Sequence, residues 1–467
     1  MARARPVNER STAARYIVRS PLLRGAFISL VVSGIGISVT APQMTLFLVR
    51  ELHLTDAMAG LYYLTNLAAP IAGYVVGSLS DRAGSRLLVF RLSAVAGFVG
   101  WTLMAFANQT WMPFAINILL LSVAGAGAAQ LQAAVRDELS RRPTPVDNQV
   151  VAVMRMAMAF GWIIGPVIGA VLGAVIGLRP LLLATGVSIL LSIVPLIGAR
   201  TARPLPGPAP APQDETLPLV AEGAAEPLTA PAARTPSMVP LLLFTGIYVL
   251  IMCGETVKLA YLPLYLDGEL HVDAGVRGAI IGFQPLVEVA LMPVAAKLAD
   301  RFGIAPVLFA GAAMAIGAHA CYASADAFAQ PLAPLIAGQV LMAGVIATFG
   351  VLGVTVAQRF HPTRVGMASS VFLSAFAINA AVGGFLGSVG TAWLGLPAVF
   401  WIPSAIAAAG AIALVVLNRY VPLDTGGPHH TDASPSAVPS RDAVDVVDGE
   451  DGEDAEAAVT GCRPSNE

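Results

Sequence analysis

The stretch Leu46–Leu54, with the sequence LFLVRELHL, recurs at Leu264–Val272 as LYLDGELHV. About thirty residues after each copy comes a second shared phrase, LSDRAG with Asp81 in the first half and LADRFG with Asp300 in the second. The first phrase returns after 218 residues and the second after 219. Two ordered phrases at nearly one offset predict a duplicated unit of roughly 200 residues.

Long uncharged runs indicate what kind of unit is duplicated. Hydrophobic residues make up 56% of the chain and charged residues 12%, against about 25% charged in soluble proteins. A helix needs roughly 20 apolar residues to cross a bilayer, and the 25 residues between Arg24 and Arg50 are all uncharged. Such runs predict six spans in each half. We therefore expect an all-α membrane protein with twelve transmembrane helices in two six-helix bundles.

Composition divides the chain into five predicted parts. The run Pro204–Pro210 cannot form a packed helix and predicts a linker, and Asp442–Glu456 contains eight acidic residues and no basic one. The predicted parts are a basic cytoplasmic N-terminal tail (1–24), an N-terminal six-helix bundle (25–199), a cytoplasmic Pro/Ala-rich linker (200–237), a C-terminal six-helix bundle (238–420) and a disordered acidic cytoplasmic tail (421–467).

Arginine placement predicts the orientation in the membrane. The N-terminal tail carries six arginines, and the loops after the second, fourth, eighth and tenth spans are also basic. The alternate loops are acidic or uncharged. Because cytoplasmic loops carry the excess of Lys and Arg, both termini are expected in the cytoplasm. The tail is too long and the first span too long for a cleaved signal peptide.

The phrase GSLSDRAGSR resembles the cytoplasmic loop signature of the major facilitator superfamily, G-x-L-a-D-r-x-G-r-R. The matching residues are Gly77, Leu79, Asp81, Arg82, Gly84 and Arg86. The second copy, with Asp300, Arg301 and Gly303, matches more weakly because Ala296 replaces the first glycine. In that family the aspartate helps to hold the halves together on the cytoplasmic side. The alternative interpretation is a solvated loop with positive-inside charge.

A second signature lies in the predicted fifth span. Its residues Gly161, Gly165, Pro166 and Gly169 resemble the family's antiporter motif, G-x-x-x-G-P-x-x-G, which is associated with exporters. Small residues at this spacing also form a groove for a neighbouring helix. Helix packing without any information on direction is therefore the alternative.

Ionisable residues inside spans are costly and indicate function. Glu255 and Lys258, three residues apart, can neutralise each other. Glu288 has no charged neighbour along its own helix, so we expect it to gain and lose a proton, unless it pairs with Arg155 or Lys258. All four are proton-coupling candidates. Arg136, like Arg155, is alternatively an interfacial anchor.

Uncharged polar residues predict the substrate site. Asn66 corresponds to Gln284 at the repeat offset, and amides both donate and accept hydrogen bonds, which suits a ligand rich in hydroxyl groups. The substrate-binding candidates are Gln43, Asn66, Gln130, Gln284, Gln339 and Asn379, with Gln132 as a further polar residue. Each of them could instead join helices to one another.

Within the superfamily, the chain most resembles the bacterial sugar efflux transporters. The matching residues are Ala41, Pro42, Leu46–Leu48, Arg50, Glu51, Asn66, Arg136, Arg155, Gly165, Pro166, Pro263, Leu264, Glu269, Leu270 and Glu288. The resemblance implies a location in the cytoplasmic membrane of a bacterium. It also implies proton-coupled efflux of a sugar, glycoside or similar small polar solute by alternating access. The alternative is a multidrug or metabolite exporter of the same fold.

Other classes of protein are disfavoured. No span has clustered His or acidic residues at metal-ligand spacing, and no G-x-x-x-x-G-K-[S/T] loop is present, which disfavours a membrane enzyme and an ATP-driven pump. We expect no cofactor, no metal and no nucleic acid. The expected partners are protons, a sugar-like solute and the lipid bilayer, and the expected state is a monomer.

Overall fold

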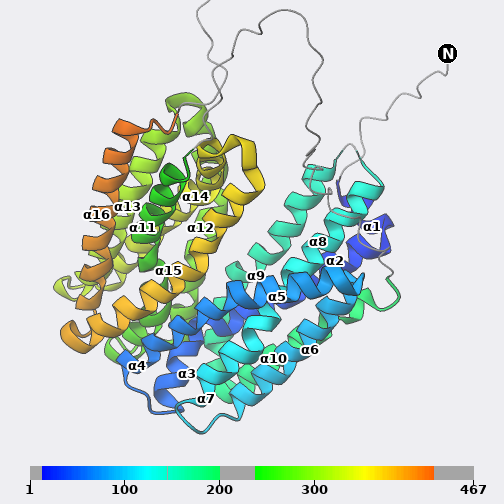
Figure 1. Cartoon of the computed structure of the whole chain (residues 1–467). Helices are drawn as coiled ribbons and strands as arrows, with labels where there is room; N and C mark the ends of the chain where they lie inside the picture. The colour runs from blue at the N-terminus through cyan, green and yellow to red at the C-terminus, as the bar shows by residue number, and fades with distance from the viewer. Residues whose placement is uncertain (1–12, 145, 200–236, 425–467) are drawn as a thin grey trace, which may run out of the picture. The chain divides into compact units, whose positions relative to one another are not determined.

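A computed structural model of the chain describes residues 13–144, 146–199 and 237–424 (Figure 1). All regular structure within these residues is helical. The first half contains α1 (Ala13–Arg19), α2 (Pro21–Thr40), α3 (Met44–Arg50), α4 (Asp56–Leu61), α5 (Ala68–Ala83), α6 (Arg86–Ala105), α7 (Met112–Ile116), α8 (Ser122–Arg141), α9 (Asp147–Ile176) and α10 (Leu178–Leu191). The second half contains α11 (Val239–Leu264), α12 (Ala274–Phe302), α13 (Ile304–Ala323), α14 (Leu332–Phe360), α15 (Val365–Leu394) and α16 (Trp401–Tyr420).

Short 3-10 or π-helical segments extend or join several of these helices. They are η1 (Ala41–Gln43), η2 (Tyr62–Leu67), η3 (Asn117–Leu121), η4 (Val194–Leu196), η5 (Tyr265–Glu269), η6 (Ala325–Ala327), η7 (Pro362–Arg364) and η8 (Ala398–Phe400). The predicted linker and the acidic end of the chain, 200–236 and 425–467, lie outside the described residues.

Eleven helical segments in the described chain are long and apolar enough to cross a membrane, and they coincide with eleven predicted spans. The other predicted span lies between Asp56 and Asp81, and the structure forms it from α4, η2 and α5. It is not among the eleven, and its 3-10 segment carries the polar Thr65 and Asn66. The helical architecture agrees with the predicted fold class.

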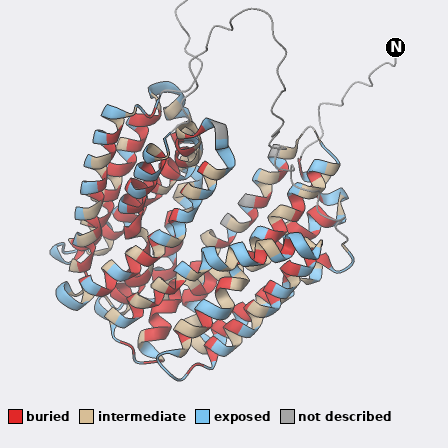
Figure 2. Ribbon diagram, in the orientation of Figure 1, coloured by how far each residue is buried: buried red, intermediate tan, exposed pale blue. Residues whose placement is uncertain are grey.

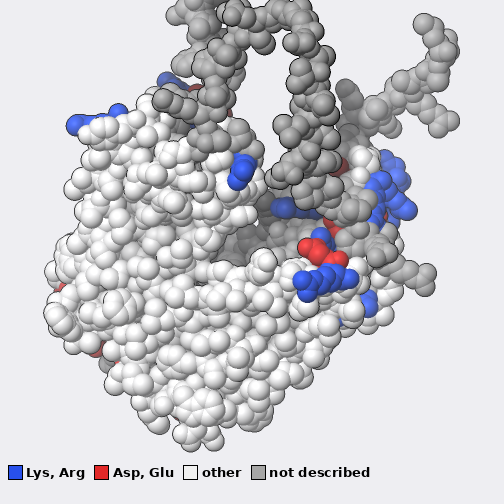
Figure 3. All heavy atoms as spheres, in the orientation of Figure 1, with Lys and Arg blue, Asp and Glu red and all other residues white. Residues whose placement is uncertain are grey.

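The outer surface is that of a membrane protein. Large apolar side chains such as Ile412 and Leu242 are exposed, while buried residues lie where helices face one another (Figure 2). Charged side chains are sparse over most of the face in Figure 3. Exposed Trp393 and Tyr420 stand at the ends of α15 and α16, as expected of aromatic residues at the two membrane–water interfaces.

The repeated ELH phrase forms the same turn in both halves. The N–H of Leu54 donates to the carbonyl oxygen of Leu48 at 3.1 Å, and the N–H of Val272 donates to that of Leu266 at 2.8 Å. The histidine before each donor has a positive φ, 54° in the first half and 50° in the second. We name this end of the molecule the ELH end.

The DR phrase also recurs as structure. In each half a helix stops at a glycine with positive φ, Gly84 at 66° and Gly303 at 90°. This left-handed conformation favours glycine because it has no Cβ atom. We name the end that carries these two phrases the DR end.

The apolar core shows where the halves join. One continuous core fills the second half and extends into the ELH end of the first, where it includes Phe47 and Leu48. A separate core at the DR end of the first half contains Ala13 and Ile17 of α1. Within the described residues, the shared core therefore lies at the ELH end, and part of the predicted tail 1–24 is packed helix.

Candidate functional site

Two close helix contacts join the halves. α12 lies against α9, and α15 lies against α4 and η2. A Cβ atom added to Gly278 of α12 would come 2.7 Å from a Cα atom of α9. A Cβ atom added to Gly384 of α15 would come 2.7 Å from the carbonyl oxygen of Gly60. Both contacts therefore depend on glycine, which lets two backbones approach closely.

The antiporter-like sequence packs α9 against α2 within the first half. The hydroxyl of Ser38 donates to the carbonyl oxygen of Gly161 at 2.7 Å. Cβ atoms added to Gly165 or Gly169 would overlap atoms of α2, and Pro166 lies inside α9. The described contacts of the three glycines are thus packing contacts with α2, while the carbonyl oxygen of Pro166 lies against Gly278 of α12.

A charge cluster crosses the halves at the ELH end. Asp267 pairs with Arg50 of the first half and with Arg277 of the second. Beside it, Arg179 Nε lies 2.9 Å from Glu51 Oε2, and both of these residues belong to the first half. Asp267 and Glu51 both lie in the repeated turn. Of these two carboxylates, only Asp267 forms an ion pair between the halves.

Sequence reasoning used these charges only for orientation and missed the cluster. The signal that could have found it is a break in the repeat. Val49 stands in the first copy where Asp267 stands in the second, and Arg50 corresponds to Gly268. The two copies therefore supply the opposite charges of one ion pair.

The two DR loops are held differently. In the first half, Arg86 donates to Asp81 at 2.7 Å and to Asp137 of α8 at 3.2 Å. In the second half, Asp424 accepts from the N–H of Ile304 at 2.5 Å and so caps α13 from beyond α16. The other motif residues, Gly77, Arg82, Asp300 and Arg301, make no hydrogen bond or ion pair to described residues of the opposite half.

A triad of buried Lys258, buried Gln284 and half-buried Glu255 joins α11 to α12. Lys258 Nζ lies 2.7 Å from Glu255 Oε1 and also donates to Gln284 Oε1. Gln284 Nε2 donates to the same oxygen of Glu255 at 3.4 Å. The other oxygen, Glu255 Oε2, is buried with no hydrogen-bond partner among the described residues. The pairing expected within α11 is formed, and Gln284 extends it to a second helix.

The other ionisable candidates lie in neighbouring spans. Glu288, one turn after Gln284 on α12, is half-buried and forms no hydrogen bond or ion pair with the described side chains. Arg155 lies on α9, and its side chain is outside the described residues. Arg136 is exposed on α8.

The amide candidates fall into two groups. Gln339 is fully engaged, accepting from Tyr322 at 2.7 Å and donating to the carbonyl oxygen of Ile280 at 2.8 Å. Asn66 donates to a carbonyl oxygen of its own helical segment at 3.1 Å, so it does not pair with Gln284. Buried atoms without a partner among the described residues are Gln43 Nε2, Gln130 Oε1 and Asn379 Oδ1. Gln132 Nε2 lies 3.7 Å from Met158 Sδ.

A cavity of about 170 Å³ brings two of these candidates together. Its lining residues are Tyr248, Met252, Glu255, Thr256, Ile346, Gly350, Phe376 and Asn379. Sequence reasoning missed Tyr248 and Phe376, because an aromatic side chain inside a span is first interpreted as a residue of the packed core. The cavity combines a carboxylate, an amide and two aromatic rings.

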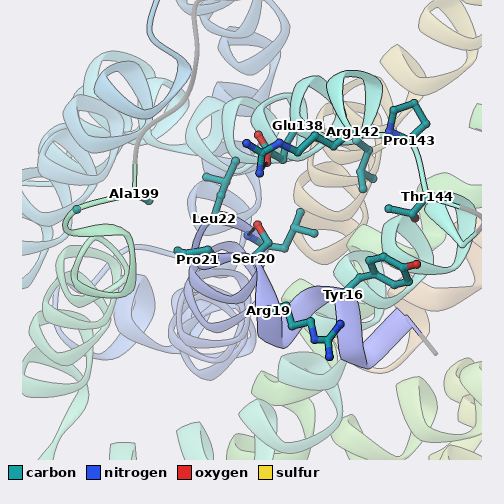
Figure 4. A pocket seen from close by; sticks show the side chains of 13 residues that line it. Tyr16, Arg19, Ser20, Pro21, Leu22, Glu138, Arg142, Pro143, Thr144 and Ala199 are labelled. Carbon is teal, nitrogen blue, oxygen red and sulfur yellow. Dashed lines mark hydrogen bonds and ion pairs between the residues drawn. The ribbon is translucent and has the colours of Figure 1, made fainter. Parts of the chain in front are cut away.

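A larger cavity, of about 870 Å³, lies at the DR end of the first half (Figure 4). α1, the start of α2 and the end of α8 line it, with Tyr16, Glu138 and Arg142 among its side chains. None of the predicted substrate or proton-coupling residues lines it. Its volume alone does not make it the transport site, because the buried polar groups described above lie elsewhere.

Comparison with known proteins identifies relatives over most of the chain. A sequence model of the Major Facilitator Superfamily matches residues 26–254 and 244–444. Sugar efflux transporter A of Dickeya chrysanthemi is 25% identical over 407 residues, which cover 86% of this chain and 98% of that protein. Sugar efflux transporter B of Salmonella typhimurium is 22% identical over 373 residues, covering 79% of this chain and 88% of that one.

Solved structures share the fold. The nucleoside transporter NupG superposes with a TM-score of 0.65 at 15% identity, covering 85% of this chain and 99% of that chain. The peptide transporter POT in complex with sulfate gives a TM-score of 0.67 at 12% identity, covering 89% and 100%. The predicted fold class and the predicted resemblance are confirmed.

Proposed function

Because the chain belongs to the major facilitator superfamily, we propose that it exports a sugar, glycoside or similar small polar solute in exchange for protons. The chain is a multi-pass membrane transporter rather than an enzyme, as are its relatives and structural neighbours. The observation that carries the proposal is the Lys258–Glu255–Gln284 triad, with Glu288 one turn further along α12. Charged groups in hydrocarbon are costly and mark solute or proton pathways.

Alternating access between two states is the proposed mechanism. The halves share their apolar core, the Asp267 cluster and the glycine contact at Gly60 near the ELH end. The described DR-loop residues form their hydrogen bonds and ion pairs within one half. We take this arrangement as the state closed at the ELH end, and opening it requires the Asp267 cluster to separate.

Orientation, domain boundaries and assembly complete the proposal. The excess of arginine supports an orientation with the DR end and both termini in the cytoplasm of a bacterial cell. Residues 200–237 then form a cytoplasmic linker between the bundles, and 421–467 form a cytoplasmic tail. A single chain supplies both halves, so the proposed transporting unit is a monomer.

Uptake into sealed inverted vesicles tests the proposal. An imposed proton gradient is expected to drive accumulation of a labelled sugar, and ATP without a gradient is expected to drive none. A panel of neutral sugars, glycosides and drugs, tested on one vesicle preparation, distinguishes sugar efflux from multidrug or metabolite export. Accumulation of drugs without any sugar would replace sugar efflux by multidrug export.

A further inference from the structure

A carboxylate residue, an amide residue and two aromatic residues line the 170 Å³ cavity between α11, α14 and α15. We propose that it is a subsite for one neutral, hexose-sized sugar ring, with its hydroxyl groups on Glu255 and Asn379 and its apolar face against Phe376. This inference rests on the proposed transport of sugar-like solutes and adds where, and by what chemistry, the ring is recognised.

Helical spacing places the lining residues on shared faces. Tyr248, Met252 and Glu255 follow one another at i, i+4 and i+7 along α11, and Phe376 and Asn379 at i and i+3 along α15. Residues at these intervals lie on one side of a helix. With Ile346 and Gly350, four residues apart on α14, the cavity is built by three helix faces that converge from different parts of the chain.

Two of the lining side chains each carry a buried oxygen atom without a hydrogen-bond partner among the described residues. Glu255 Oε1 is occupied by Lys258, but Oε2 has no partner among the described residues. Asn379 is 6% exposed, and its Oδ1 atom also lacks a described partner. Buried polar groups are normally hydrogen-bonded. Neighbouring sugar hydroxyl groups can donate to a carboxylate and either donate to or accept from an amide.

The charge of the site selects a neutral ring. Lys258 compensates the negative charge of Glu255, so the pair is neutral as a unit. An acidic sugar would bring a carboxylate with no counter-charge into the bundle, where an unpaired charge is costly. A neutral polyol meets no such penalty.

Size and aromatic surface agree with a single ring. Cavities for drug-sized ligands measure roughly 300–1,000 Å³, and this one is smaller. Phe376 is 55% exposed, and its ring centroid lies 6.0 Å from that of Tyr248. An aromatic face can cover the C–H face of a sugar while the hydroxyl groups at the rim reach the polar atoms.

Gly350 offers a direct probe of occupancy. It lines the cavity, and a Cβ atom added there would meet no atom within 4 Å. Gly246 on α11 is a matched control, because its position is equally open but does not line this cavity. We would introduce Gly350→Cys or Gly246→Cys into the full chain after replacing its three native cysteines with alanine. Alkylation by N-ethylmaleimide is then measured in liposomes with D-glucose or D-glucuronate.

Glucose is expected to slow the alkylation of Gly350→Cys at least threefold and to leave the alkylation rate of Gly246→Cys unchanged. Glucuronate is expected to protect Gly350→Cys far less than glucose does. Transport of glucose without this protection would overturn the subsite and leave sugar export standing. Protection without transport would support the subsite and overturn export. Neither effect, or equal protection by both sugars, would overturn the subsite as described.

Side-chain variants identify the binding groups. Asn379→Ala and Phe376→Ala, each combined with Gly350→Cys, are expected to raise the glucose concentration for half protection by roughly two- to tenfold. Phe385→Ala is the control, because Phe385 is a similarly exposed phenylalanine of α15 outside the cavity. An equal shift in all three variants would mean a general loosening of α15 and would overturn the assignment.

Discussion

The two halves share a backbone plan but bury different chemistry. Among the described side chains, the buried polar groups of the first half are hydroxyls and amides, such as Ser29 and Gln130. The second half buries Lys258, Arg277 and His319 as well. The duplicated halves therefore share one backbone scaffold, but among the described side chains the buried ionisable groups belong to the second half. The first half contributes mainly helix packing.

Removing Lys258 should produce the largest effect. Lys258→Met leaves Glu255 without its cation inside the bundle, and breaking a buried pair costs about 3 kcal/mol or more of stability. Thermal unfolding in detergent measures the loss, and adding Glu255→Gln should recover most of it. Glu51→Gln removes a more exposed pair of the first half, with Arg179, and should cost less than about 1 kcal/mol. Equal losses would break the contrast between the halves.

Glu288→Gln should abolish proton-driven accumulation. The substitution keeps shape and hydrogen bonding but removes the titrating group, so we expect accumulation in vesicles to fall at least tenfold while energy-independent exchange continues. Glu269→Gln, at an exposed carboxylate of the ELH end, is the control and should accumulate normally. Normal accumulation by Glu288→Gln would leave Glu255 as the acidic candidate, whereas loss of binding would assign Glu288 to the solute site.

Asp267→Asn should weaken the contact between the halves. It neutralises the shared partner of Arg50 and Arg277, so the population with a separated ELH end should rise several-fold. Spin labels at Met58 and Phe328, exposed on opposite halves at this end, measure that separation by electron paramagnetic resonance.

Glu51→Gln removes the neighbouring pair to Arg179 within one half and should leave the distance distribution unchanged. An unchanged distribution for Asp267→Asn as well would remove the cluster from the gating step.

The two loop aspartates should matter unequally. Both aspartates are exposed, but Asp81 accepts from Arg86, which also bonds to Asp137, whereas Asp300 forms no hydrogen bond or ion pair with described side chains. We expect Asp81→Asn to slow transport about fivefold and Asp300→Asn less than twofold, both at normal membrane abundance. Initial rates of transport in vesicles, normalised to the amount of transporter, show which of the two substitutions has the larger effect. Wild-type rates for Asp81→Asn would remove the motif from the mechanism.

Capping of the DR loops should give the smallest effect. Ser85 caps α6 locally in the first half, and Asp424 caps α13 from a distance in the second. Asp424→Ala and Ser85→Ala should each cost about 1 kcal/mol of stability, measured by thermal unfolding.

Truncation after Thr425 keeps the Asp424 cap and should leave substrate exchange largely intact. A large loss on truncation would assign the tail a regulatory role.

The sequence by itself determined the membrane class, the spans, the duplication and the family. Each of these depends on local composition or on a phrase that can be read along the chain. The free energy of placing roughly 20 apolar residues in a bilayer is large enough to define a span without knowledge of its neighbours. The pairing of Glu255 with Lys258 was also readable, because three residues along a helix bring two side chains onto one face.

Only the tertiary structure decided which polar groups meet across helices. Gln284 accepts a hydrogen bond from Lys258 and does not pair with Asn66. Gln339 donates its hydrogen bond to the backbone of another helix, and Arg50 forms an ion pair with Asp267 of the other half. Spacing along one helix cannot predict these contacts, since they depend on how the helices are rotated and how closely glycines let them approach. Every polar group in a membrane interior needs a partner, but the chain can supply that partner from hundreds of residues away.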